Sequence, residues 1–580
     1  MRSSLSFTLA SITSAVVLAG CGDGGASSSS GGGTGGATCT SASCGGATSM
    51  GGGGAAPITG TIPGKVARYD YVFDEDALTA DTQLTVNVEA PGGDCTDFES
   101  KVPTTGEVTW NGDPAASATL DADVLHVCGK GLAEGPLVVK APTTYPKKKY
   151  FGLDVGFSRK TNLAGGDFFY LLSWVGGCAN FGPCDSDPGT LSEFHIDVKH
   201  AAGTTVLCPG KLTPGDTSTH CDIDGALAPT YSAVAFASDA MWKKKPFMTA
   251  NGVDWTFYEV PGGSLASSLD PAKMSEFFGW ITNLLGPFPY GDELRFAGAP
   301  TAWLGFEHPA NIVLLEDLDK LVTDYANSAQ HVTMHETTHQ WAGDRSTIAT
   351  GLDFVWKEAT AEYLPYVFED EHIDAQTSAA SLAYWDGVSL QSLHYPRPTD
   401  DPPPAVNTFY GDVYGPGPMV LYVQLEALIG RDKVLAGIQS FLKEPGARSV
   451  DDLRAAMETA SGKDLKPYYD AWVFGAGAPE WPTMKIATSQ AGSEVTVTVT
   501  QENASGKVYP CVVEVEVDGA TTKTTAKIDF GLAPQSEIAS AKVTLAEPVI
   551  GTVLDPSHKL VAREKAAPLV APKKRPVWIF

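Results

Sequence analysis

The sequence predicts a multidomain α+β protein with an N-terminal all-β domain, a mainly helical middle domain and a C-terminal β-sandwich. At 580 residues the chain is too long for one hydrophobic core. Short apolar runs, several of them alternating with polar residues as half-buried strands do, fill residues 58–250, and strict alternation returns within 481–562. Between these regions, at 251–480, apolar residues recur at helical spacing.

The N-terminal domain is expected over residues 58–250, where short apolar runs are separated by Gly, Pro and Asp. Three of these runs alternate clearly: Leu84–Glu89, Phe194–Lys199 and Ala233–Phe236. The C-terminal sandwich, expected over 481–562, has its strongest strand patterns at Glu494–Thr500 and Cys511–Gly519. Residues 563–580 are expected to form a tail, and its last part, Pro572–Phe580, carries no recognisable pattern.

The middle domain is predicted from its helix signals. Asp270 is a candidate N-cap and Pro271 occupies the next position, so a helix is expected to begin there. A strand-like run lies at 310–316. Further helical patterns occur near 324–342, 353–368, 416–430 and 449–460.

The first twenty residues are typical of a targeting segment. Arg2 supplies a positive charge, and Phe7–Gly20 is an apolar stretch too short to span a bilayer. It ends at Leu18-Ala-Gly-Cys21, which resembles the lipobox of bacterial lipoproteins, a family in which the Cys is acylated. The resemblance implies a signal peptide at 1–20 and a bacterial cell-envelope protein anchored to a membrane through lipidated Cys21. An ordinary secretory signal with a chance cysteine is the alternative.

Composition supports export and excludes one class of partner. Residues 21–57 are Gly, Ser, Thr and Ala with almost no large apolar side chain, which predicts a flexible tether. The formal charge of −28 repels polyanions, so nucleic acid is excluded as a partner. Cys511 is expected to be a buried free thiol. Eight other cysteines lie close in sequence and indicate local disulfides: Cys39 with Cys44, Cys95 with Cys128, Cys178 with Cys184, and Cys208 with Cys221.

The sequence His335-Glu336-Thr-Thr-His339 carries the chemistry of the middle domain. Positions four apart lie on one face of a helix, so both imidazoles can reach one Zn²⁺ ion. Glu336 follows the first histidine, where its carboxylate can take a proton from an activated water and return it to a leaving amine.

Glu358 is the predicted third ligand. It lies on a second helical run, and eighteen residues separate it from His339. A His₂Glu set leaves the fourth zinc position open, as catalytic sites require. Glu362, one turn further on, is expected to be a surface residue or to support the ligands from behind. His331 forms a rival pair with His335, but that pairing loses both the following Glu and the eighteen-residue spacing.

These motifs resemble the aminopeptidase N family of gluzincin zinc peptidases. The family motif is His-Glu-x-x-His-x₁₈-Glu, with Gln-Trp-x-Gly after the second His, as in 335–344 of this chain. The resemblance covers roughly 60–560 and implies a thermolysin-like catalytic domain with one Zn²⁺ per chain. Other similar segments follow in order: Phe181–Pro188, Leu285–Tyr290, Gly305–His308, Tyr414–Gly417, Ser461–Leu465, Trp472 and Gly477–Pro479.

The resemblance implies roles for further residues. Glu307 would bind the free α-ammonium of a peptide, and Gly305 would let the substrate backbone approach closely. Tyr414 would donate a hydrogen bond to the tetrahedral oxyanion, with Tyr410 as the competing candidate. The chain departs from the family at Phe-Glu-His in place of Met-Glu-Asn, and at Lys357 in place of Asn before the last ligand. Around 171–177 there is no Gln to assist amine binding.

The sequence therefore predicts a zinc metallopeptidase acting on peptides, most closely an aminopeptidase. One alternative is a zinc endopeptidase on the same scaffold. Another is an envelope protein that has lost catalysis and uses the fold for binding, against which the intact His₂Glu set argues.

Overall fold

The computed structural model of the chain describes residues 62–145, 156–301, 303–321, 328–391, 418–474 and 480–565. Cys21, the predicted signal peptide and tether, and the Cys39–Cys44 pair lie outside the described residues. So do Tyr410 and Tyr414. No helix in the described part of the chain is both long and apolar enough to cross a membrane.

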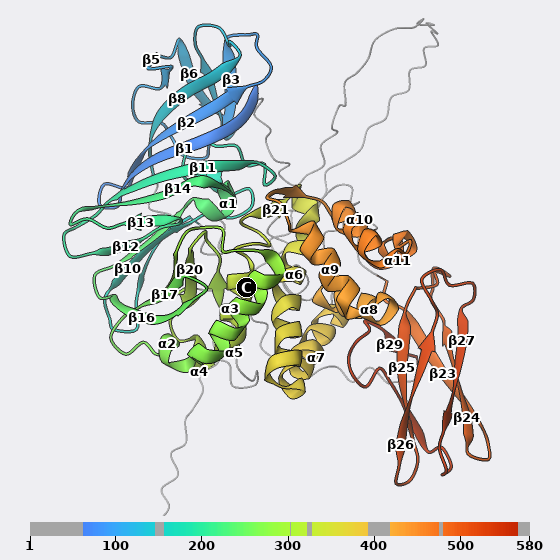
Figure 1. The fold of residues 1–580 in the computed structure, drawn as a ribbon. Coiled ribbons are helices and arrows are strands. Elements are labelled where there is room, and N and C mark those ends of the chain that lie inside the picture. Colours follow the sequence, from blue (N-terminus) through green and yellow to red (C-terminus); the bar gives the residue numbers. More distant parts are fainter. Residues whose placement is uncertain are drawn as a thin grey trace, which may run out of the picture. The chain divides into compact units, whose positions relative to one another are not determined.

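The N-terminal domain is built from strands, coloured blue to cyan-green in Figure 1, as the alternating pattern predicts. Its inward-facing residues form a core of their own that includes Tyr69, Tyr71 and Phe194. The strands and two short helices are β1 (Gly64–Asp74), β2 (Thr79–Val88), β3 (Cys95–Glu99), β4 (Thr109–Trp110), β5 (Asp113–Pro114), β6 (Ser117–Asp121), β7 (Val124–Cys128), β8 (Gly135–Thr144), β9 (Gly156–Thr161), β10 (Asp167–Leu172), η1 (Cys178–Asn180), β11 (Leu191–Lys199), β12 (Thr205–Leu207), β13 (Lys211–Thr213), β14 (Ser218–Pro229), α1 (Thr230–Ala233) and β15 (Ala235–Asp239).

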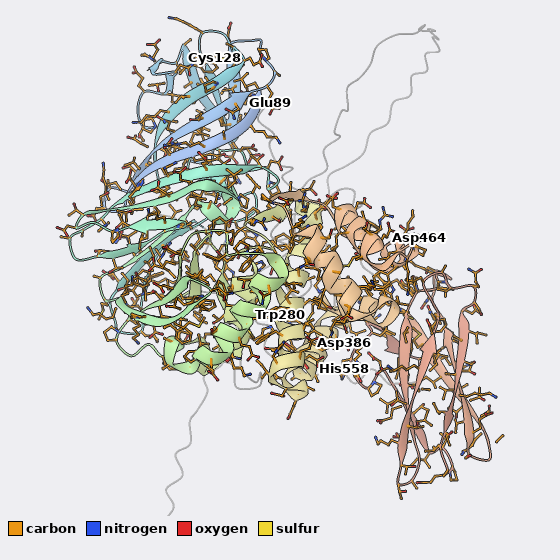
Figure 2. All side chains as sticks on the ribbon, viewed as in Figure 1. Glu89, Cys128, Trp280, Asp386, Asp464 and His558 are labelled. Carbon is orange, nitrogen blue, oxygen red and sulfur yellow. A yellow bond between two sulfur atoms is a disulfide. The ribbon has the colours of Figure 1, made fainter. Side chains whose placement is uncertain are left out.

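Three sheets make up this domain. The largest has the order β13-β14-β11-β1-β2-β8-β4-β5, and the two smaller ones have the orders β12-β15-β10-β9 and β3-β7-β6. Three predicted disulfides are confirmed: Cys95–Cys128 (Cys128 is labelled in Figure 2), Cys178–Cys184 and Cys208–Cys221. Cys511 is free and buried, as expected.

The middle domain contains a five-stranded sheet of order β16-β17-β18-β20-β19. Its strands are β16 (Lys243–Ala250), β17 (Val253–Glu259), β18 (Glu293–Ala299), β19 (Gly305–Phe306) and β20 (Asn311–Leu315). Strand β16 falls within the range predicted for the N-terminal domain, yet it pairs antiparallel with β17. The sheet of the middle domain therefore begins at Lys243 rather than at 251, because a tight turn at Asn251-Gly252 joins the two strands as a hairpin.

Helices dominate the rest of the middle domain, and the predicted ones are present. Helix α3 begins at Asp270, whose side chain caps the N–H groups of Ala272 and Lys273. The helices and the remaining strand pair are α2 (Leu265–Ser268), α3 (Pro271–Leu285), α4 (Leu318–Leu321), α5 (Ser328–Thr338), β21 (Ser346–Ile348), η2 (Gly351–Asp353), α6 (Phe354–Phe368), η3 (Glu369–Ile373), α7 (Ala375–Gln391), α8 (Met419–Ile429), α9 (Arg431–Phe441), β22 (Gly446–Arg448), α10 (Val450–Ser461) and α11 (Lys466–Trp472).

Helix α6 is the central element of this domain. All fifteen of its residues are buried, including two glutamates and a lysine. A helix that is buried on every side belongs to the interior of a large domain, and polar residues survive there only when they are paired. Helix α5 packs directly against α6, and polar residues of the two helices contact one another, as His331 and His335 contact Glu362.

The C-terminal domain consists of two small sheets, of orders β27-β24-β23-β29 and β26-β25-β28. Buried valines alternate along β24 and β25 and fill the space between the sheets. The strands are β23 (Thr483–Ala491), β24 (Glu494–Gln501), β25 (Val512–Asp518), β26 (Lys523–Asp529), β27 (Ile538–Thr544), β28 (Gly551–Leu554) and β29 (Arg563–Glu564).

Candidate metal centre

His335 and His339 lie at the C-terminal end of α5, one turn apart. Their Nε2 atoms are 3.1 Å from each other, and both rings are buried. The other nitrogen of each ring is held by a fixed partner. His335 Nδ1 lies 2.9 Å from a Glu362 carboxylate oxygen, and His339 Nδ1 lies 2.9 Å from the carbonyl oxygen of Ala342. An N–H at each Nδ1 leaves both Nε2 lone pairs directed at the same point.

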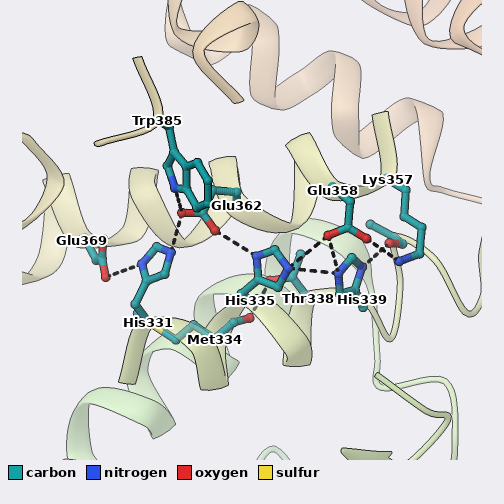
Figure 3. Close-up of polar contacts among 11 residues, drawn as sticks. His331, Met334, His335, Thr338, His339, Lys357, Glu358, Glu362, Glu369 and Trp385 are labelled. Carbon is teal, nitrogen blue, oxygen red and sulfur yellow. Dashed lines mark hydrogen bonds and ion pairs between the residues drawn. The ribbon is translucent and has the colours of Figure 1, made fainter. Parts of the chain in front are cut away.

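Glu358 of α6 completes this set of donors (Figure 3). Its Oε2 atom is 3.3 Å from His335 Nε2 and 3.4 Å from His339 Nε2. Ligands that bind a tetrahedral Zn²⁺ at roughly 2.0–2.1 Å are about 3.4 Å from one another. The three donor atoms are therefore spaced as three corners of a zinc coordination tetrahedron.

A ladder of histidines and glutamates runs behind the donors along α5 and α6. Glu362 accepts hydrogen bonds from His335, from His331 Nε2 at 2.7 Å and from Trp385 Nε1. His331 Nδ1 lies 2.8 Å from Glu369 Oε1. His331 is thus held between two carboxylates and does not join the donor set, and Glu362 is a buried support of a ligand rather than a surface residue.

Hydrogen bonds and close packing fix the conformation of the residues that follow His339. Gln340 Nε2 donates to the carbonyl of His308 and to Asp344, while its Oε1 accepts from the N–H of Ala310. Gly343 has φ of 151°, and a Cβ at this position would lie 2.9 Å from Lys357 Cε. The conformation favours glycine, and the contact leaves no room for a side chain. These residues tie the end of α5 to the sheet and to α6.

Glu336 lies beside the donors with one oxygen uncommitted. Its Oε2 is buried and has no hydrogen-bond partner within the described part of the chain. Burial raises its pKa well above the usual range; the nearby Glu307 and Glu358 add to the rise and His335 opposes it. Burial would raise the pKa of Glu358 as well, but Lys357 and His339 hold that pKa well below the usual range. Neighbouring carboxylates with opposite pKa shifts suit different roles, one as a proton carrier and one as a permanent anion.

The residues present fit a divalent metal ion. Glu307, Glu336 and Glu358 are three buried carboxylates, and Lys357 is the cation that contacts two of them. Buried charges persist only with partners, so the excess negative charge and the uncommitted oxygen of Glu336 match a cation at the donor set. Two imidazoles and one carboxylate are the ligand types that Zn²⁺ binds in catalytic sites.

Gly305 packs on Glu336. It lies in β19, and a Cβ added to it would be 2.3 Å from Glu336 Oε1. Gly305 was expected to make room for a substrate backbone; the structure shows that it also makes room for this carboxylate.

We expect Gly305→Ala to lower kcat about 100-fold, because displacing a catalytic group by about 1 Å has that effect. Metal content should stay unchanged, since the three atoms nearest to the added Cβ all belong to Glu336 and none to a donor residue. Gly279→Ala in α3, where a Cβ meets nothing within 4 Å, is the matched control. Unaltered kcat in Gly305→Ala would show that this contact does not position Glu336.

Glu307 follows β19 and lies beside the centre. One oxygen is 2.6 Å from Lys357 Nζ, and one oxygen each of Glu307 and Glu336 and a nitrogen of His339 lie within 4.8 Å of one another. The Lys357 contact has no counterpart among the sequence predictions. Tyr414 and Tyr410 lie outside the described residues, so the oxyanion assignment stays a prediction.

The site thus combines a His₂Glu donor set with an adjacent glutamate on two packed helices. Residues 305–472 match the Peptidase family M1 domain. The matched segment contains the three donors and Glu336, and it is similar to the family that the motifs resemble.

Several individual proteins are similar to the chain. Aminopeptidase N of Lactobacillus delbrueckii subsp. lactis is 27% identical over 322 residues, which are 51% of this chain and 37% of the relative. Aminopeptidase N of Streptomyces lividans is 25% identical over 419 residues, 67% of this chain and 47% of the relative. The matches thus span less than half the length of either relative. In fold the chain is similar to aminopeptidase A of Legionella pneumophila, solved in complex with aspartic acid, with a TM-score of 0.70, 15% identity, and coverage of 88% of this chain and 60% of that one.

Proposed function

We propose that this chain is a zinc-dependent metalloaminopeptidase that releases N-terminal residues from peptides. The observation that carries the proposal is the spacing of the three donor atoms at 3.1, 3.3 and 3.4 Å, beside the uncommitted oxygen of Glu336. His335, His339 and Glu358 hold one Zn²⁺ per chain. A Zn²⁺ ion held there would act as a Lewis acid. It would lower the pKa of water, so that a nucleophile forms at neutral pH, and it would polarise the peptide carbonyl.

The chain's own residues orient the reactants and move the proton. Glu336 accepts the proton of the attacking water and delivers it to the leaving amine, because its uncommitted oxygen lies beside the donors. Strand β19 is the edge strand of its sheet, so a substrate backbone can pair along it. Glu307, next along the chain, then lies at the amino end of the substrate.

Peptide cleavage tests the proposal. Purified protein supplied with zinc is incubated with a peptide library, and the products are identified by mass spectrometry. Stepwise loss of single N-terminal residues, abolished by a chelator and restored by zinc, is the expected result. A library left intact under all these conditions would contradict the proposal.

Tyr414 is proposed as the donor to the oxyanion. Tyr414→Phe should lower kcat about 100- to 1000-fold without changing zinc content, because it removes one hydrogen bond to the tetrahedral intermediate. Steady-state kinetics of Tyr414→Phe and Tyr410→Phe decide the assignment. A large loss in Tyr410→Phe alone would transfer the role to Tyr410.

A lipid on Cys21 is proposed to anchor the protein in the bacterial cell envelope, on the strength of the Leu-Ala-Gly-Cys sequence. Cys21→Ser should move the protein from the membrane fraction to the soluble fraction, because it removes the acylation site. Fractionation followed by immunoblotting measures this shift. Unchanged partitioning would argue against the anchor.

A further inference from the structure

Lys357 is an ammonium group enclosed in the catalytic domain. It is the only buried lysine among the residues that the structure describes, with no exposed surface. Its Nζ lies 2.6 Å from Glu307 Oε1 and 2.7 Å from Glu358 Oε1. The rings of Trp174, Phe354 and Tyr231 surround it, with centroids 5.3, 5.4 and 6.0 Å from Nζ. Two carboxylates and three aromatic faces are the surroundings that bind a cation.

The ammonium group of a peptide would be recognised next to Lys357, at Glu307. Glu307 is the carboxylate next to the edge strand, and Lys357 already forms an ion pair with it. A second ammonium on the same carboxylate would lie close to the first, and like charges in a buried site repel strongly. The peptide's ammonium therefore gains less from Glu307 than it would gain from an unpaired carboxylate.

The N-terminal domain covers Lys357 with an aromatic ring. Segment 171–177, where the sequence offers no Gln, brings Trp174 to the site. The Trp174 ring packs edge-on against Phe306 and Phe354, at 5.2 and 5.6 Å between centroids. What this segment contributes is thus a cover over Lys357.

We propose that Lys357 is an internal counter-ion for Glu307 that sets the substrate class of this site. Because of it, the enzyme accepts peptides with an uncharged amino terminus, such as N-acylated peptides, nearly as well as peptides with a free one. The inference rests on the proposed peptidase function and changes only how the amino terminus is recognised. Lys357 is a positioning residue, since it acts through Glu307.

The first test uses the zinc-loaded wild-type protein and two forms of one peptide, free and N-acetylated. The kcat/KM values of the two peptides are expected to lie within about tenfold of each other. An ammonium that contacts an unpaired Glu307 would raise kcat/KM roughly 10- to 150-fold, but Glu307 is already paired with Lys357 and most of this gain is lost. A preference of more than tenfold for the free peptide would overturn the proposal.

The second test removes the counter-ion. Lys357→Met keeps the length of the side chain and frees Glu307, so the ratio of kcat/KM for free over acetylated peptide should rise roughly 10- to 150-fold. A purely structural role of Lys357 would lower both values and leave the ratio unchanged. Lys273→Met, which removes a lysine paired with Glu276 on α3, is the control and should not alter the ratio. An unchanged ratio in folded Lys357→Met would overturn the proposal.

A binding measurement separates this inference from the proposed function. Calorimetric titration of zinc-loaded Glu336→Gln with the free and the acetylated peptide reports recognition without turnover. Dissociation constants within about tenfold of each other are expected, and a larger difference in favour of the free peptide would contradict the role of Lys357. Absence of hydrolysis of both peptides by wild type would contradict the proposed function, and the titration would still decide about Lys357. Should Lys357→Met fail to fold, the two wild-type kcat/KM values decide alone.

Discussion

Replacing Glu336 by Gln is expected to lower kcat roughly 10²- to 10⁴-fold while the protein keeps its metal, because proton transfer by a positioned side chain contributes that much. Gln has nearly the same shape as Glu, but its amide cannot accept the proton of the attacking water. None of the three donor atoms belongs to Glu336, so the donor set should survive the change.

Two measurements on the same preparation check this expectation: kcat on an aminoacyl-amide substrate, and zinc content by mass spectrometry. A kcat within tenfold of wild type would exclude Glu336 as the proton carrier. A loss of zinc that parallels the loss of activity would show that Glu336 supports the metal instead.

Glu362→Gln is expected to weaken zinc binding about 10- to 100-fold, the effect typical of losing a partner that orients a metal-binding histidine. Glu362 accepts hydrogen bonds from His335, His331 and Trp385, and it is almost fully buried. A single amide oxygen cannot accept from all three donors, and the amide N–H₂ would face an imidazole N–H.

Competition with a chelator of known affinity measures this effect. Glu276→Gln is a matched control, because Glu276 is an exposed carboxylate that contacts His372 Nδ1 at 3.1 Å without touching the centre. Equal zinc affinity in wild type and Glu362→Gln would show that Glu362 does not support metal binding by orienting His335.

The donor set was predictable from the sequence because it depends on local geometry. His335 and His339 share a helix face through their spacing of four, and the eighteen-residue interval to Glu358 adds a motif that few proteins carry. The rule that residues four apart share a helix face also applies to the residues behind the donors. His331 continues the face of the histidines and Glu362 that of Glu358, so the ladder between α5 and α6 was visible as two sets of residues four apart.

Other features depend on tertiary contacts that spacing does not encode. Lys357 meets Glu307 because β19 and α6 come together in the folded domain, fifty residues apart along the chain. A glycine at position 305 indicates that another group packs closely on the strand, but the sequence does not identify this group as Glu336. Strand β16 lies within the range predicted for the N-terminal domain, 58–250, but it pairs with β17 of the middle domain, and a sequence pattern does not encode which strand is the partner.

The zinc content of the purified protein tests the central claim most directly. Wild type, Glu358→Ala and the surface control Glu276→Gln are each dialysed against trace zinc and measured by inductively coupled plasma mass spectrometry. The account predicts one zinc per chain in wild type and in Glu276→Gln, and far less than one in Glu358→Ala, which lacks one of the three donors. Wild-type protein without bound zinc, or full zinc content in Glu358→Ala, would contradict it.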